Sequence, residues 1–174
     1  MENFLRSYEL DSARKSEVFP DCVPMLTALK ELGAKVGLVT NTSSEAVEIV
    51  VRNHDLNSFF DLCVSRKDVK RLKPDPEGIL LAVERLKVRR FVMVGDLALD
   101  VFAARAAGGV AILIKRQGGR SDLEDFSKSL PQEILEEMQV DSETNRRLRP
   151  DYVVHSLAQI PRIVEVESGR FSIC

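Results

Sequence analysis

The sequence has 174 residues, of which 44% are hydrophobic and 30% charged, and its formal net charge is -2. This length and balance are typical of one soluble globular domain with a sizeable core, and they exclude a disordered chain. A nearly neutral charge also argues against nucleic acid as a partner. The three cysteines are odd in number and widely spaced, which favours a reducing compartment. Because the first ten residues contain no signal-peptide core, we expect a cytoplasmic location and no membrane partner.

The chain begins with two predicted helices. Residues 1–17 carry apolar side chains at helical spacing and no buried strand. Asp21 is expected to cap the second helix, and Gly33 to end it in a left-handed turn. The buried stripe of this second helix is predicted at Met25, Leu26, Leu29 and Leu32.

Five short apolar runs are predicted to be strands, at residues 36–39, 62–64, 91–94, 110–114 and 152–154. Helical patterns of about ten residues separate most of these runs. This alternation predicts an α/β fold, a doubly wound parallel sheet with helices on both faces. Right-handed crossovers would bring the polar loops that follow the strands to one edge of the sheet.

Residues 116–150 interrupt the alternation with Gly118, Gly119 and a dense mixture of charges. Helices are expected near 122–128 and 133–138, and we interpret the segment as an insertion or a partner surface. A short strand-like tail is expected at residues 171–173.

Asp96 and Asp100 follow the apolar run at residues 91–94 and lie four positions apart. If the chain enters a helix there, both carboxylates can face one point at the carboxyl edge of the sheet. Two such carboxylates suit Mg2+ and a phosphate substrate. The alternative is that Asp96 caps the helix and that Asp100 is a solvated acid in its first turn.

Two further polar places follow or precede predicted elements. Thr40 and Asn41 come directly after the first strand, and Lys73 precedes Pro74 at the entry to a helix. Taken singly, Thr40 is equally compatible with a loop hydroxyl and Lys73 with a solvated lysine. If Lys73 is a site lysine rather than a buried partner, Lys73→Ala is expected to change stability little, and a loss above about 2 kcal/mol would indicate a structural role.

Together these places resemble the second, third and fourth sequence motifs of the haloacid dehalogenase (HAD) superfamily, in the same order. The resemblance covers residues 19–114 and extends to a final strand and helix at 151–164. It implies a HAD-like Rossmannoid core at residues 19–174, with residues 1–18 as the remnant of a cap or linker. Within the superfamily, general resemblance suggests a phosphoglycolate-phosphatase-like member.

The resemblance also implies a division of roles. Thr40 and the backbone at Asn41 would bind phosphoryl oxygens, Lys73 would be the catalytic cation, and Asp96 with Asp100 would hold Mg2+. The expected function is then a magnesium-dependent phosphatase acting on a small phosphorylated metabolite. The alternative is a catalytically inactive HAD-fold protein with a binding or regulatory role.

The sequence contains no Asp-x-Asp-Gly after an apolar strand, the first HAD motif, which carries the nucleophile and the general acid. In the family that strand lies between the strands that precede Thr40 and Asp96. The simplest hypothesis is that this part of the protein lies outside the sequence. The second is that residues 170–173 or a partner segment fill the position, which would favour a homodimer or strand exchange. Whether the chain is an active enzyme stays open.

Overall fold

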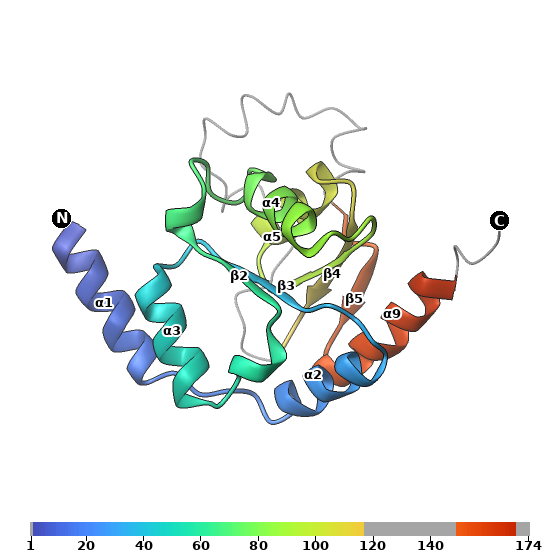
Figure 1. The fold of residues 1–174 in the computed structure, drawn as a ribbon, viewed down its shortest axis with the longest axis horizontal. Helices are drawn as coiled ribbons and strands as arrows, with labels where there is room; N and C mark the ends of the chain where they lie inside the picture. The colour runs from blue at the N-terminus through green and yellow to red at the C-terminus, as the bar shows by residue number, and fades with distance from the viewer. Residues whose placement is uncertain (1, 117–148, 170–174) are drawn as a thin grey trace.

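The computed structural model describes residues 2–116 and 149–169 (Figure 1). Its helices are α1 (Glu2–Arg14), α2 (Cys22–Glu31), α3 (Ser44–Asn53), α4 (Glu77–Leu86), α5 (Ala98–Ala106) and α9 (Ile160–Gly169). Short 3-10 helices are η1 (Asn57–Phe59), η2 (Arg66–Asp68) and η4 (Leu157–Gln159). Its strands are β1 (Gly37–Val39), β2 (Leu62–Val64), β3 (Val92–Gly95), β4 (Val110–Ile114) and β5 (Tyr152–Val154). No helix in these ranges has the length and apolar character needed to cross a bilayer.

The predicted α/β class and the parallel pairing are confirmed. In the described part of the chain, β1 pairs with β2, and β4 lies between β3 and β5 in a second ladder. Helices α4 and α5 cover one face, and α2 and α9 cover the other (Figure 1). All five predicted strands form within one residue of their expected bounds. The helices expected within residues 116–150 and the tail at 171–173 lie outside the described residues.

Alternation along the strands builds a core on each face of the sheet. Met93 and Leu113 pack on the side of Ile79 and Val101, which come from α4 and α5. Their neighbours Val92, Val94, Ile112 and Ile114 pack on the opposite side, with Ile160 of α9. Because successive side chains of a strand point to opposite faces, apolar residues at every position predict this two-sided burial.

The edge of β1 away from β2 has no strand beside it among the described residues. The N–H of Thr40 donates to the carbonyl oxygen of Val64 at 2.9 Å, so Thr40 faces β2. In a parallel ladder alternate residues bond to the two neighbouring strands. The backbone groups of Gly37 and Val39 therefore face the open edge.

β3 has a matching open edge. The carbonyl oxygen of Phe91 accepts the N–H of Val110 at 3.2 Å, so Val92 and Val94 direct their backbone groups away from β4. The side chains of Val92 and Val94 are only half-buried, whereas β4 is buried from Ala111 onward. A central apolar strand is normally covered on both sides. The described residues thus leave a gap between β1 and β3, at the position that the sequence predicts.

The predicted limits of α2 need two corrections. Leu26 and Leu29 are buried as expected, but Leu32 is 42% exposed because the helix ends one residue earlier and Gly33 turns the chain with φ of 71°. Asp21 precedes the helix, but its side chain forms no capping hydrogen bond.

Asp21 instead joins three segments of the chain. Its carboxylate accepts hydrogen bonds from the Ser156 hydroxyl and the Leu157 N–H at 2.8 Å each, and from the Arg116 guanidinium at 2.7 Å. The Arg116 guanidinium also stacks 3.8 Å from the centre of the Phe19 ring. Asp21 therefore connects the segment before α2 with the segments that follow β4 and β5.

This network makes the stability of the fold depend on the charge of Asp21. Burial raises the pKa of the carboxyl, but the bonds from Arg116, Ser156 and Leu157 and the Arg116 charge outweigh it and lower that pKa from 3.8 to about 2. A pKa that is lower in the folded state stabilises the fold above pH 3.8, and this contribution disappears as the pH falls from there through about 2.

We therefore expect Asp21→Asn to lower the free energy of unfolding by about 1–2 kcal/mol at pH 7. Urea unfolding at pH 7 and pH 3 measures the effect. The difference in free energy of unfolding between Asp21→Asn and the wild type should be smaller at the lower pH. Asp11→Asn is the matched control, because the ion pair of Asp11 with Arg14 is about 60% exposed on both sides. The control should change stability by less than about 0.5 kcal/mol. Equal losses in the two variants would contradict this prediction.

Candidate functional site

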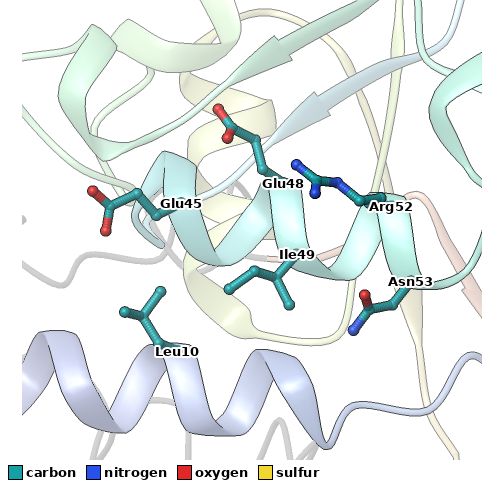
Figure 2. A pocket seen from close by; sticks show the side chains of 6 residues that line it. All are labelled: Leu10, Glu45, Glu48, Ile49, Arg52 and Asn53. Atoms are coloured by element: carbon teal, nitrogen blue, oxygen red, sulfur yellow. The ribbon is translucent and has the colours of Figure 1, made fainter.

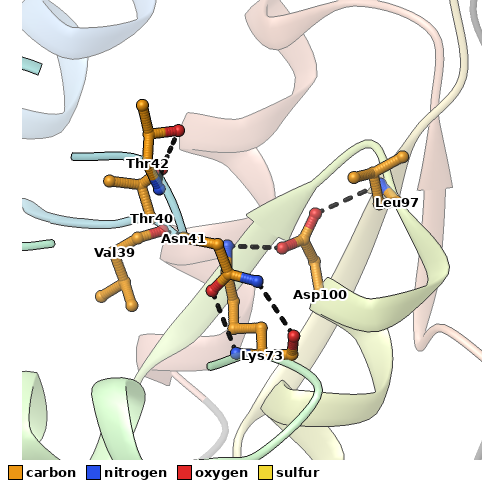
Figure 3. Close-up of polar contacts among 7 residues, drawn as sticks. All are labelled: Val39, Thr40, Asn41, Thr42, Lys73, Leu97 and Asp100. Atoms are coloured by element: carbon orange, nitrogen blue, oxygen red, sulfur yellow. Dashed lines mark hydrogen bonds and ion pairs between the residues drawn. The ribbon is translucent and has the colours of Figure 1, made fainter. Parts of the chain in front are cut away.

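Lys73 connects the carboxyl ends of β1 and β3 (Figure 3). Its ammonium donates to the Asp100 Oδ1 at 2.7 Å and to the Val39 carbonyl oxygen at 3.0 Å. The side chains of Lys73 and Asp100 are 10% and 7% exposed. The structure therefore rules out a solvated Lys73 and places it between the loop that follows β1 and the first turn of α5.

Asn41 fixes the backbone of Lys73. The Asn41 Nδ2 donates to the Lys73 carbonyl oxygen at 2.9 Å, and the Lys73 N–H donates to the Asn41 Oδ1 at 3.0 Å (Figure 3). The backbone N–H of Asn41 has no acceptor among the described residues. The side chain of Asn41 is thus structural, while its backbone N–H is available to an anion.

The segment before Lys73 is anchored to the first turn of α4. The Glu77 carboxylate accepts the N–H of Lys70 at 2.9 Å and that of Arg71 at 3.1 Å. The bond from Lys70, with the Arg71 contacts, lowers the pKa of Glu77 against the opposing effect of desolvation. The Lys73-Pro74 peptide bond is cis. These contacts turn the chain so that Lys73 extends back towards β1.

Asp100 is held from both sides. Its second oxygen, Oδ2, accepts the N–H of Leu97 at 3.2 Å. Leu97 occupies the N-cap position of α5, so Asp96 is not the cap, and Asp100 is buried rather than solvated. Gly95 makes this arrangement possible, because a Cβ at that position would lie 2.3 Å from the Asp100 Cβ. The structural alternative for the two acids is therefore wrong.

Asp96 and Asp100 differ in what they can offer a cation. Asp96 is exposed and makes no hydrogen bond or ion pair with any described residue, whereas both Asp100 oxygens have protein partners. Magnesium accepts one or two carboxylates and keeps several waters, so the two acids fit it in kind. Within the described ranges no three His, Cys, Asp or Glu side chains gather around a point that would hold a metal.

Thr40 shapes its own loop. Its Oγ1 donates to the Thr42 Oγ1 at 3.0 Å and accepts the Thr42 N–H at 3.1 Å (Figure 3). Sequence reasoning missed Thr42, although a hydroxyl bonding a backbone group two residues on is a common turn. It also missed the Val39 carbonyl oxygen, for which no sequence signal exists because it belongs to the backbone.

Two family models match this chain. One, described as haloacid dehalogenase-like hydrolase, matches residues 1–114, and one described as HAD-hydrolase-like matches residues 71–160. Together they span all the site residues named above.

Individual curated proteins and a solved structure are also similar to this chain. The chain is 34% identical over 113 residues to a pyrophosphatase PpaX of Bacillus mycoides, covering 63% of this chain and 51% of the relative. It is 33% identical over 107 residues to a phosphoglycolate phosphatase of Shigella boydii, covering 60% and 42%. A solved HAD phosphatase from Thermococcus onnurineus superposes with a TM-score of 0.68 at 26% identity, covering 92% of this chain and 64% of that one. The chain thus spans about half the length of these two curated relatives.

Proposed function

Because the chain belongs to the haloacid dehalogenase-like hydrolase family, we propose that it forms the phosphoryl-binding core of a magnesium-dependent phosphatase for a small phosphorylated metabolite. The observation that carries the proposal is the buried Lys73 ammonium, held at 2.7 Å from Asp100 beside the loop of Thr40 and Asn41. The relatives named phosphoglycolate phosphatase and pyrophosphatase support a small phosphate compound as the substrate.

The phosphoryl group would be bound by neutral and cationic donors. The Thr40 hydroxyl and the Asn41 N–H lie next to each other after β1, and the single Thr40 proton would turn from the Thr42 Oγ1 to a phosphoryl oxygen. An ammonium has three N–H donors, and Val39 and Asp100 accept two from Lys73, so one remains for a phosphoryl oxygen. Phosphoryl transfer depends mainly on positioning and charge stabilisation, and these groups supply both.

Asp96 and Asp100 would hold the magnesium ion, which when bound neutralises charge on the phosphoryl oxygens. With Asp100 already engaged by Lys73, we expect weak binding, with a dissociation constant on the order of 1 mM or above. Isothermal titration with MgCl2 measures it, and tight stoichiometric binding would contradict this assignment of roles.

The attacking carboxylate is not among the described residues at this site. We propose that it is carried by a strand in the gap between β1 and β3. The backbone groups of Val39 and Val94 face that gap, and Lys73 lies at its carboxyl end. An acid at the end of such a strand would lie beside the Lys73 ammonium.

A binding or regulatory role without catalysis is the second candidate. The absence of Asp-x-Asp-Gly from the 174-residue sequence favours it. Supplying a synthetic apolar strand peptide that ends in Asp-x-Asp-Gly separates the two. Turnover of 4-nitrophenyl phosphate that appears with this peptide, and not with an Asn-x-Asn-Gly control, would support the phosphatase.

The purified chain alone tests the proposal directly. We expect it to bind inorganic phosphate, followed by 31P NMR, and to hydrolyse no 4-nitrophenyl phosphate with magnesium present. Thr40→Ala should weaken phosphate binding about tenfold. The control is Thr27→Ala, because the Thr27 hydroxyl bonds only to the Val23 carbonyl oxygen, on the exposed side of α2. Equal binding by both variants would refute the proposed site, and turnover lost on Asp96→Asn would show that the nucleophile lies within the chain.

A further inference from the structure

A carboxylate on α1 contacts the loop of residues 40–43 from outside. The Glu9 Oε2 accepts the N–H of Ser43, the last residue before α3, at 3.4 Å. Both Glu9 oxygens also accept hydrogen bonds from the Arg66 guanidinium, at 3.0 Å each. The Glu9 side chain is 21% exposed. Paired, planar contacts of this kind restrict geometry more strongly than a single ion pair.

Arg66 contacts the same loop with its main chain. Its N–H donates to the Thr42 carbonyl oxygen at 3.1 Å. The turn that carries Arg66 is itself fixed, because the Asp68 Oδ2 accepts the Ser65 N–H at 2.8 Å and the Ser65 hydroxyl at 2.7 Å. These two bonds lower the pKa of Asp68. Arg66 therefore links α1, the end of β2 and the loop.

We infer that Glu9 and Arg66 are a positioning pair that holds the loop of residues 40–43 in shape from α1. Neither residue touches the phosphoryl group; both act through Thr42 and Ser43 on the Thr40 hydroxyl and the Asn41 N–H. The inference rests on the proposed phosphate site.

The Glu9–Arg66 pair strengthens phosphate binding through two physical effects. The donors of an anion site stabilise charge best when they are held in place before binding, and the pair restrains both ends of this loop. Arg66 also neutralises Glu9, whose unpaired carboxylate near the N-terminus of α3 would oppose an incoming phosphate. Loss of the guanidinium thus weakens phosphate binding through both effects.

The chain offers a matched control in Arg6 and Glu45. This pair has the same chemistry, with contacts of 2.8 and 2.9 Å, and joins the same helix α1 to α3. It is 60% and 49% exposed and contacts no loop backbone. Glu45 lines an open hollow of about 280 Å³ between the two helices, where Leu10 extends towards Ile49 (Figure 2).

The experiment measures two quantities in the full chain: the affinity for inorganic phosphate by 31P NMR, and hydrogen exchange at the amides of Thr42 and Ser43. Arg66→Gln should weaken phosphate binding roughly fivefold and speed exchange at both amides. Glu45→Gln should keep the phosphate affinity and the amide exchange rates within about twofold of the wild-type values. Arg66→Lys keeps a positive charge beside Glu9 but loses the paired planar contacts, so it should recover only part of the phosphate affinity and leave exchange at both amides fast.

Each outcome decides the inference. Phosphate binding that is equal in the wild type and Arg66→Gln would overturn it while leaving the proposed function intact. If the wild type binds no phosphate, the proposed function fails, and the amide exchange of Arg66→Gln against Glu45→Gln still shows whether the pair holds the loop. Full recovery of phosphate binding in Arg66→Lys would show that the positive charge acts by itself, which contradicts a positioning role.

Discussion

Replacing Lys73 with Met is expected to lower the free energy of unfolding by about 3 kcal/mol or more. Met keeps most of the aliphatic stem but removes the ammonium. The Asp100 carboxylate, 7% exposed, then stays buried without its cation, and the Val39 carbonyl oxygen loses its donor. Breaking a buried ion pair from one side is costly because one charge remains uncompensated.

Urea unfolding at pH 7 measures this effect, with Lys67→Met as the control. Lys67 is exposed, so its replacement should change stability by less than about 0.5 kcal/mol. The double variant with Lys73→Met and Asp100→Asn should recover part of the loss, because no buried charge is left. A loss below about 1 kcal/mol for Lys73→Met alone would show that water replaces the ammonium at little cost.

The sequence alone does not predict that Lys73 is buried. Its neighbours are Arg71, Leu72 and Pro74, which are typical of a solvated turn, and they favour a lysine whose removal costs little. The burial comes from tertiary contacts with Asn41 and Asp100, which lie 32 and 27 residues away in the chain. The expectation that Lys73→Ala has little effect on stability therefore no longer applies.

The strands, by contrast, follow directly from local pattern. Residues 62–64, 110–114 and 152–154 form strands at their predicted bounds, because uninterrupted apolar runs fit a sheet covered on both faces. Side-chain partners of charged residues were harder to predict. Asp21 stands at a capping position, yet Arg116 and Ser156 outcompete the helix for its carboxylate, and both are distant in sequence.

The reason for the glycine at position 95 could not be predicted from the sequence either. The sequence marks Gly95 only as the end of a strand beside Asp96. The structure adds the reason for a glycine there. The carboxylate of Asp100 folds back over the end of β3, so that a Cβ on residue 95 would lie 2.3 Å from the Asp100 Cβ and 2.4 Å from its Oδ2. Real atoms do not approach so closely, so either β3 or the first turn of α5 must shift.

We therefore expect Gly95→Ala to destabilise the fold by about 3 kcal/mol and to weaken phosphate binding, since Asp100 can no longer hold Lys73 in place. The control is Gly169→Ala at the end of α9, where an added Cβ meets no atom within 4 Å and stability should be unchanged or slightly raised. Urea unfolding and 31P NMR measure the two effects, and equal stability of the two variants would contradict the steric argument.

The losses in the free energy of unfolding caused by Gly95→Ala and by Lys73→Met should not be additive. Both act by separating the Asp100 carboxylate from the Lys73 ammonium, so the second substitution finds the contact already lost. The double variant is expected to lose at least about 1 kcal/mol less than the sum of the single losses. Strict additivity would mean that the added Cβ displaces β3 instead of Asp100, and that the ion pair survives in Gly95→Ala.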